Sequence, residues 1–97
     1  MKVLLAPTAL YDLEEIGDFI AADSPRAAKS VVAALRRKYG QLATMAERHP
    51  PVVGREAAGL RQMPHGSYLI YYFVEDRTVI VTRVLHGARD MTALLGD

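Results

Sequence analysis

The chain has 97 residues, of which 51% are hydrophobic and 24% charged, and its formal net charge is +1. This length fits one domain, residues 1–97, and the composition is that of a globular rather than a disordered chain. Because the sequence has no cysteine, it excludes a disulfide framework and a thiolate metal site and fits the reducing cytoplasm. The near-neutral charge argues against strong direct binding to nucleic acid. We expect neither a signal peptide nor a membrane span.

The chain opens with a short apolar segment, residues 2–6, which predicts a strand that Pro7 ends. A helix is expected to follow at once, with Thr8 at its N-cap. Its apolar residues recur at spacings of four, three and four, and they are Ala9, Leu13, Ile16 and Ile20. The residues between them include Asp12, Glu14, Glu15 and Asp18. This spacing predicts one apolar face and one acidic face.

A second, longer helix is predicted from Pro25 to about Glu47. Ser24 is suited to cap its free N–H groups, and proline is favoured at a first helical position. Its apolar stripe includes Ala28, Leu35, Tyr39 and Leu42. Gly40 is a weak point, because glycine costs helix stability. Two amphipathic helices with so short a junction predict an antiparallel helical hairpin.

The second half of the chain predicts a loop and then a β-meander. Residues 50–59 show no sustained period and are expected to form the loop. Strands are expected at residues 60–63, 68–74 and 78–85, with turns at 64–67 and 75–77. The middle strand is apolar on both alternating faces, which is typical of a central strand. Residues 87–95 predict a short C-terminal helix.

The order of these elements predicts the α+β class. We expect an N-terminal strand, an antiparallel helical hairpin and a three-stranded antiparallel meander in a mostly antiparallel sheet, with the helices on one face. The apolar residues on the other sheet face are then left for solvent, a partner or the C-terminal segment.

Two stretches of the sequence resemble the ParE toxins of the RelE/ParE superfamily. The first runs from Leu60-Arg61 through Pro64, Gly66 and Tyr68 into the central strand, and the second is Arg83-Val84-Leu85-His86-Gly87-Ala88-Arg89-Asp90. The resemblance implies a toxin of a toxin–antitoxin pair that poisons DNA gyrase without catalysis. It also implies a ParD-type antitoxin as partner, in a hetero-oligomer, and no cofactor.

The RelE branch of this superfamily is implied to cleave messenger RNA in the ribosome, and it supplies the alternative function. That chemistry needs several basic residues and a C-terminal tyrosine around the phosphate. Leu69 and Leu95 stand here where the resemblance would place one of the arginines and that tyrosine. We therefore favour a gyrase-directed toxin that is not an enzyme, with an endoribonuclease or a degenerate member without toxicity as alternatives.

The candidate target-binding residues lie near the two resembling stretches, and they are Arg61, Arg83, His86, Arg89 and Asp90. Arg83 falls within an apolar strand, where a charge is tolerated only if it reaches solvent or a carboxylate. Two interpretations of Arg83 and Arg89 stay open. They either contact the target or anchor the C-terminal segment through an ion pair with Asp90. His86 is better explained by hydrogen bonding at a strand end than by catalysis, and the histidine spacing gives no metal signature.

We expect the antitoxin to cover apolar surface and a sheet edge, by strand addition or by a helix laid on the helical hairpin. The candidate contact residues are Leu13, Ile16, Ile20, Leu35, Tyr71 and Phe73. The acidic face of the first helix serves solubility or binds arginines of the antitoxin.

Overall fold

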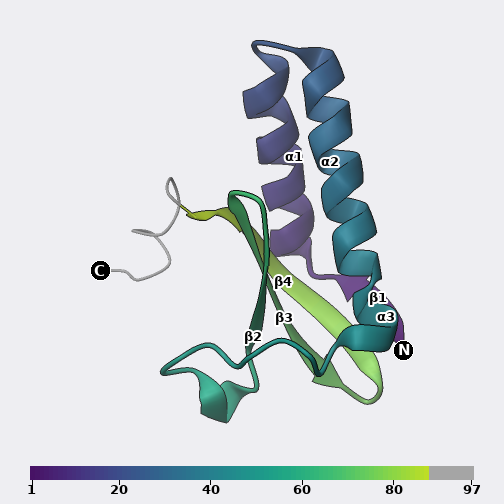
Figure 1. Ribbon diagram of the computed structural model, residues 1–97, viewed down its shortest axis with the longest axis vertical. Coiled ribbons are helices and arrows are strands. Elements are labelled where there is room, and N and C mark those ends of the chain that lie inside the picture. The colour runs from purple at the N-terminus through teal and green to yellow at the C-terminus, as the bar shows by residue number, and fades with distance from the viewer. Residues whose placement is uncertain (88–97) are drawn as a thin grey trace.

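The computed structural model describes residues 1–87, which form a helical hairpin and a four-stranded sheet (Figure 1). The elements in chain order are β1 (Lys2–Leu5), α1 (Pro7–Ala21), α2 (Pro25–Gly40), α3 (Leu42–Met45), the 3-10 turn η1 (Glu56–Ala58), β2 (Arg61–His65), β3 (Tyr68–Glu75) and β4 (Thr78–His86). The expected α+β order is confirmed. The expected C-terminal helix lies outside the described residues, apart from Gly87.

The helical hairpin follows from its local sequence signals. Ser24 caps α2 by accepting a hydrogen bond from the Ala27 amide at 3.1 Å, and Pro25 occupies the first turn, both as expected. α1 begins at Pro7 with Ala6 at the N-cap, which makes no side-chain capping bond. The expectation that Thr8 caps α1 is therefore wrong, because its hydroxyl bonds to another part of the chain.

α2 ends earlier than the apolar stripe predicts. The α-helix stops at Gly40, and the short α3 resumes after a break at Gln41. Gly40 is thus the weak point that its low helix propensity indicates. The break redirects the chain while Leu42 and Ala46 remain fully buried.

The sheet has the strand order β1-β4-β3-β2, in which only β1 and β4 are parallel. β2 pairs with β3 from Arg61 opposite Tyr72 to His65 opposite Tyr68. β2 thus extends two residues beyond the expected strand, and the turn shrinks to Gly66 and Ser67, with Gly66 at φ 58. The β3–β4 turn is equally tight and places Asp76 and Arg77 at positive φ, which matches the twist of a two-residue hairpin.

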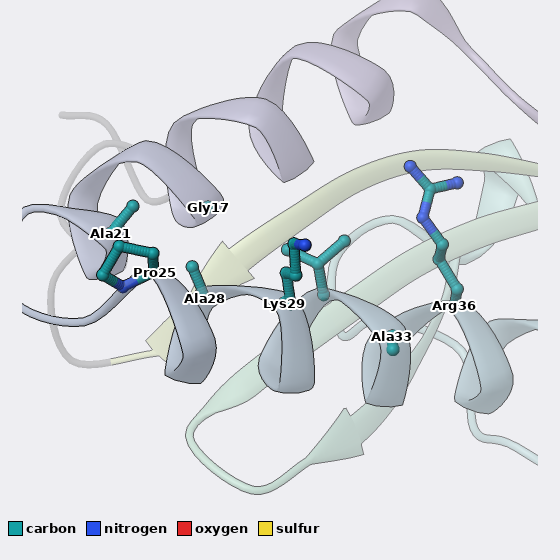
Figure 2. Close-up of a pocket in the computed structure, with 8 residues that line it drawn as sticks. Gly17, Ala21, Pro25, Ala28, Lys29, Ala33 and Arg36 are labelled. Atoms are coloured by element: carbon teal, nitrogen blue, oxygen red, sulfur yellow. The ribbon is translucent and has the colours of Figure 1, made fainter.

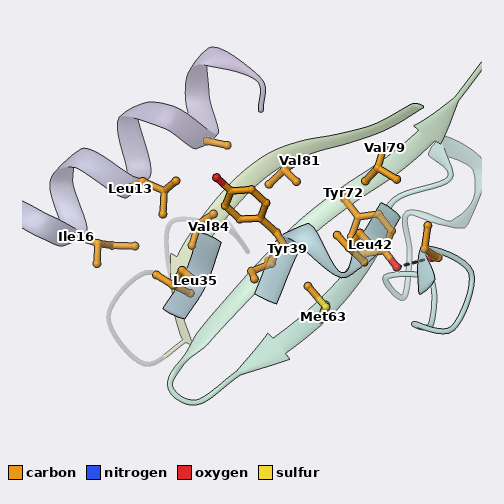
Figure 3. Close-up of a cluster of buried hydrophobic side chains, with 13 residues drawn as sticks. Leu13, Ile16, Leu35, Tyr39, Leu42, Met63, Tyr72, Val79, Val81 and Val84 are labelled. Atoms are coloured by element: carbon orange, nitrogen blue, oxygen red, sulfur yellow. Dashed lines mark hydrogen bonds between the residues drawn. The ribbon is translucent and has the colours of Figure 1, made fainter. Parts of the chain in front are cut away.

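The core lies between the helical hairpin and one face of the sheet (Figure 3). α1 and α2 contribute Leu13, Ile16, Leu35 and Tyr39, and the sheet contributes Met63, Ile70, Tyr72, Val79, Val81 and Val84. Alternation along β3 sends Leu69, Tyr71 and Phe73 to the opposite sheet face. Leu4 of β1 also avoids the core and is 47% exposed.

Candidate functional site

The N-terminal half of α1 lies along the part of β4 that β1 leaves unpaired. β1 pairs with β4 only up to Val81. Beyond it, the Ala6 amide donates to the Val81 carbonyl at 2.8 Å, and the Thr8 hydroxyl donates to the Thr82 carbonyl at 2.7 Å. The edge of β4 is therefore satisfied by a helix instead of a strand, as buried main-chain polar groups require.

The next bond along this edge comes from Asp12, which is only 7% exposed. One oxygen of its carboxylate, Oδ2, accepts from the Val84 amide at 3.0 Å and from Arg83 Nε at 2.7 Å. The other oxygen, Oδ1, accepts from Arg83 Nη2 at 3.1 Å. This bidentate pair joins α1 to β4 and corrects the assignment of Asp12 to a solvated acidic face.

A β-bulge in β4 allows Arg83 to reach Asp12. Tyr71 lies opposite Arg83 while Tyr72 lies opposite Val81, so Thr82 is an extra residue in β4. Such a bulge re-aims the neighbouring side chains, which here lets both Val81 and Val84 face the core. The Arg83 side chain remains 46% exposed. It thus meets both conditions expected from the sequence, a paired carboxylate and solvent, but its carboxylate is that of Asp12.

The other candidate target residues are not gathered around Arg83. The ring of His86 packs edge-on against Tyr68, with centroids 5.3 Å apart, and the next amide, Gly87, bonds to Ser67. Arg61 lies opposite Tyr72, four positions along β3 from Tyr68, and donates to the His49 carbonyl at 2.5 Å. Four strand residues span roughly 13 Å. Arg89 and Asp90 lie outside the described residues.

A polar cluster around His49 fixes the chain after α3. The His49 ring stands edge-on to Tyr72, with centroids 6.4 Å apart. The buried Tyr72 hydroxyl donates to the Ala46 carbonyl at 2.5 Å. Burial raises the pKa of this hydroxyl, and the positive charge of Arg61 offsets part of the rise. The cluster ties the loop to β2 and β3.

We expect the pKa of His49 to lie below its ordinary value of 6.5, because burial and then the charges of Lys38 and Arg48 disfavour the imidazolium. The unfolded chain then binds the proton first as the pH falls, so stability is lost below about pH 6.5 until the folded His49 itself titrates. An NMR titration of the ring protons and urea midpoints between about pH 5 and 7 test this. His49→Gln should flatten the pH slope. An imidazole midpoint at or above the ordinary value would contradict the expectation.

A groove runs along the helical hairpin between α1 and α2 (Figure 2). Its main part has a volume of about 480 Å³ and is lined mostly by small or apolar groups, among them Gly17, Ala21 and Ala28. A second part continues it along α1 past Leu10, Glu14 and Asp18. The two parts share Gly17, Val32 and Arg36, so they form one continuous surface, the hairpin groove. Sequence periodicity did not single it out.

The structure places most of the candidate antitoxin contacts inside the molecule. Leu13, Ile16, Leu35 and Tyr71 are at most 2% exposed, which corrects the expectation that they present a broad surface to a partner, although Leu13 does line the second part of the hairpin groove. Ile20 is half-buried and packs against the core. Phe73 is half-buried on the sheet face opposite the helices. The apolar side chains that do reach the surface of α1 are Leu10, Tyr11 and Phe19, at 45%, 60% and 66%.

Within residues 1–87, no group of three or more histidine or carboxylate side chains is placed to hold a metal ion. The same residues include no helix long and apolar enough to cross a membrane.

The strand, helical hairpin and sheet form a fold that is found in toxin–antitoxin systems. The chromosomal ParDE TA system from P. aeruginosa superposes with a TM-score of 0.76 at 18% identity, covering 89% of this chain and 95% of that one. The toxin–antitoxin complex RelBE2 from Mycobacterium tuberculosis superposes with a TM-score of 0.62 at 28% identity, covering 88% and 95%.

The chain belongs to the ParE toxin family. The profile of the family described as "ParE toxin of type II toxin-antitoxin system, parDE" matches residues 3–91. Toxin RelE2 of Caulobacter vibrioides is 39% identical over 83 residues, which are 84% of this chain and 89% of that protein. The resemblance found in the sequence is confirmed, and the chain is a type II toxin of the ParE/RelE superfamily.

Proposed function

We propose that this toxin arrests growth by binding DNA gyrase in the cytoplasm, without catalysis. The choice of gyrase as target follows from membership of the ParE family, and the observation that supports the lack of catalysis is the separation of the basic candidates. Arg83 is held by the Asp12 carboxylate, and Arg61 is held by a main-chain carbonyl at another place on the sheet. Phosphodiester cleavage needs an acid, a base and charge-stabilising groups that converge on one phosphate. The described residues offer pairwise structural bonds in place of such a constellation.

A ParD-type antitoxin would neutralise the toxin by laying an amphipathic helix in the hairpin groove. Toxin and antitoxin would then form the expected hetero-oligomer. The small residues on the groove floor leave room for large apolar side chains of a single inserted helix. A second copy of the helical hairpin would place its own groove opposite this one, and the volume of both grooves would stay unfilled. One structural relative is a toxin–antitoxin complex, and the other comes from a ParDE TA system.

The sheet edges limit where an extended antitoxin segment could add a strand. The outer edge of β2 is covered, since the Gln62 amide donates to Pro50 and the Val52 amide donates to Leu60, and Pro64 has no N–H. The edge of β4 from Val81 to Val84 is hydrogen-bonded to the start of α1 and to Asp12. β1 is the edge of the described sheet at which strand addition fits.

A ribosome-dependent endoribonuclease is the second candidate function. The observation in its favour is the 39% identity to a protein named Toxin RelE2. A degenerate member that binds antitoxin without toxicity is the third.

We expect the purified toxin to inhibit supercoiling of relaxed plasmid by gyrase and to leave messenger RNA intact in a translating extract. Both assays use the same preparation, and a stoichiometric excess of antitoxin should relieve the inhibition. Cleavage of messenger RNA with normal supercoiling would replace the proposal by the second function. Antitoxin binding with neither activity would replace it by the third.

A further inference from the structure

The two rims of the hairpin groove carry opposite charges. On the α1 side the exposed carboxylates of Glu14 and Asp18 line the groove. On the α2 side the exposed cations of Lys29 and Arg36 line it. Within residues 1–87, none of these four groups forms an ion pair, and Arg36 donates only a long hydrogen bond of 3.4 Å to the Tyr39 hydroxyl, which leaves its charge unneutralised. The rim charges are therefore available to a partner.

The floor of the groove cannot by itself set the direction of a helix that lies on it. Its main part is lined mostly by small or apolar groups, and the apolar contact that such groups offer to a helix face is non-directional. Turning the helix end for end exchanges its left and right flanks over α1 and α2. A helix with one basic and one acidic flank therefore meets opposite charges in one direction and like charges in the other, which is unfavourable.

We propose that Glu14 and Asp18, against Lys29 and Arg36, fix the direction in which the antitoxin helix runs along the groove. The matching helix carries its basic flank over α1 and its acidic flank over α2. This inference rests on the proposed docking of an antitoxin helix and adds the residues that determine its orientation. It also identifies the rim that would discriminate between antitoxins with different flank charges.

The direct test uses synthetic amphipathic peptides of about 18 residues, which is five helical turns. All share one apolar face and carry a nitroxide at the N-terminus. The first has lysines on one flank and glutamates on the other, the second has the flanks exchanged, and the third has glutamine on both. NMR of the isotope-labelled toxin then shows which end of the hairpin groove the nitroxide broadens, the turn at residues 22–24 or the end near Gly40.

We expect the first two peptides to broaden opposite ends of the groove and the glutamine peptide to broaden both. Exchanging the rims, with Glu14→Lys, Asp18→Lys, Lys29→Glu and Arg36→Glu together, should reverse the end that each charged peptide broadens. The matched control, Arg55→Glu with Glu56→Lys, alters exposed charges outside the groove and should change nothing.

Broadening of the same end by both charged peptides, or of both ends by either, would overturn the proposal. The proposal would also be overturned if no peptide shifted the resonances of the helical hairpin. A toxin dimer in sedimentation that buries the hairpin groove would overturn it as well. Gyrase inhibition is measured without peptide. A failure of the direction test therefore stays distinguishable from a failure of the toxin assignment.

Discussion

Replacing Asp12 by alanine should lower the free energy of unfolding by about 2 to 4 kcal/mol. The change removes the acceptor of the buried Val84 amide, and an unsatisfied buried donor costs about 1–3 kcal/mol. It also removes the bidentate partner of Arg83. Loss of one partner of a fully buried pair costs about 3–5 kcal/mol. The cost of leaving Arg83 without its partner is smaller here, because the Arg83 side chain is 46% exposed and solvent screens its charge.

Urea denaturation of the purified toxin measures this effect. Asp18→Ala on the same helix is the matched control and should stay within about 0.5 kcal/mol of the parent, since Asp18 is exposed. Asp12→Asn should lose less than Asp12→Ala, because an amide oxygen still accepts from Val84. A stability of Asp12→Ala equal to that of the control would show that the pair does not hold α1 on β4.

The same variants test whether Arg83, beside its pair with Asp12, also contacts the target. If Arg83 only anchors α1, then Arg83→Ala and Asp12→Asn should lose the proposed gyrase inhibition in proportion to their unfolded fraction. If its exposed part also contacts gyrase, Arg83→Ala should lose inhibition at a temperature where both variants are folded, and Asp12→Asn should keep it. Circular dichroism and supercoiling at matched temperatures distinguish the outcomes.

Truncating Leu35 to alanine should cost about 3–4 kcal/mol, within the range for a buried leucine that leaves a cavity. Leu35 is fully buried between α2 and the sheet. A domain of this size is stable by roughly 5–15 kcal/mol, so the variant should melt far below its parent. Thermal and urea unfolding give the loss directly.

Leu10 provides the matched control, because it is 45% exposed and lines the hairpin groove. Leu10→Ala should change stability by less than about 0.5 kcal/mol and should weaken antitoxin binding in calorimetry. If instead Leu35→Ala kept full stability and lost antitoxin affinity, Leu35 would belong to the docking surface after all.

The sequence by itself determined the order of the elements, the hairpin and the family. Ser24 with Pro25, the weak point at Gly40 and the short polar turns are local signals, and local signals act over a few residues wherever the chain lies. The two motifs that resemble ParE toxins are likewise contiguous. Asp12 was also within reach of the sequence, since it stands three residues after Ala9 and four before Ile16, on the apolar face of α1.

Only the tertiary structure decided the partners of the polar residues and the place of the groove. Periodicity indicates which side of a helix or strand is buried, but it does not indicate which residues lie against that side. Asp12 meets Arg83 because the parallel pairing of β1 with β4 stops at Val81, which leaves the rest of the β4 edge for α1. The bulge at Thr82 then turns Arg83 toward that edge. The hairpin groove likewise exists only when the small residues of α1 and α2 face each other. Pairings between segments distant in sequence depend on strand order and helix packing, and those are properties of the folded chain.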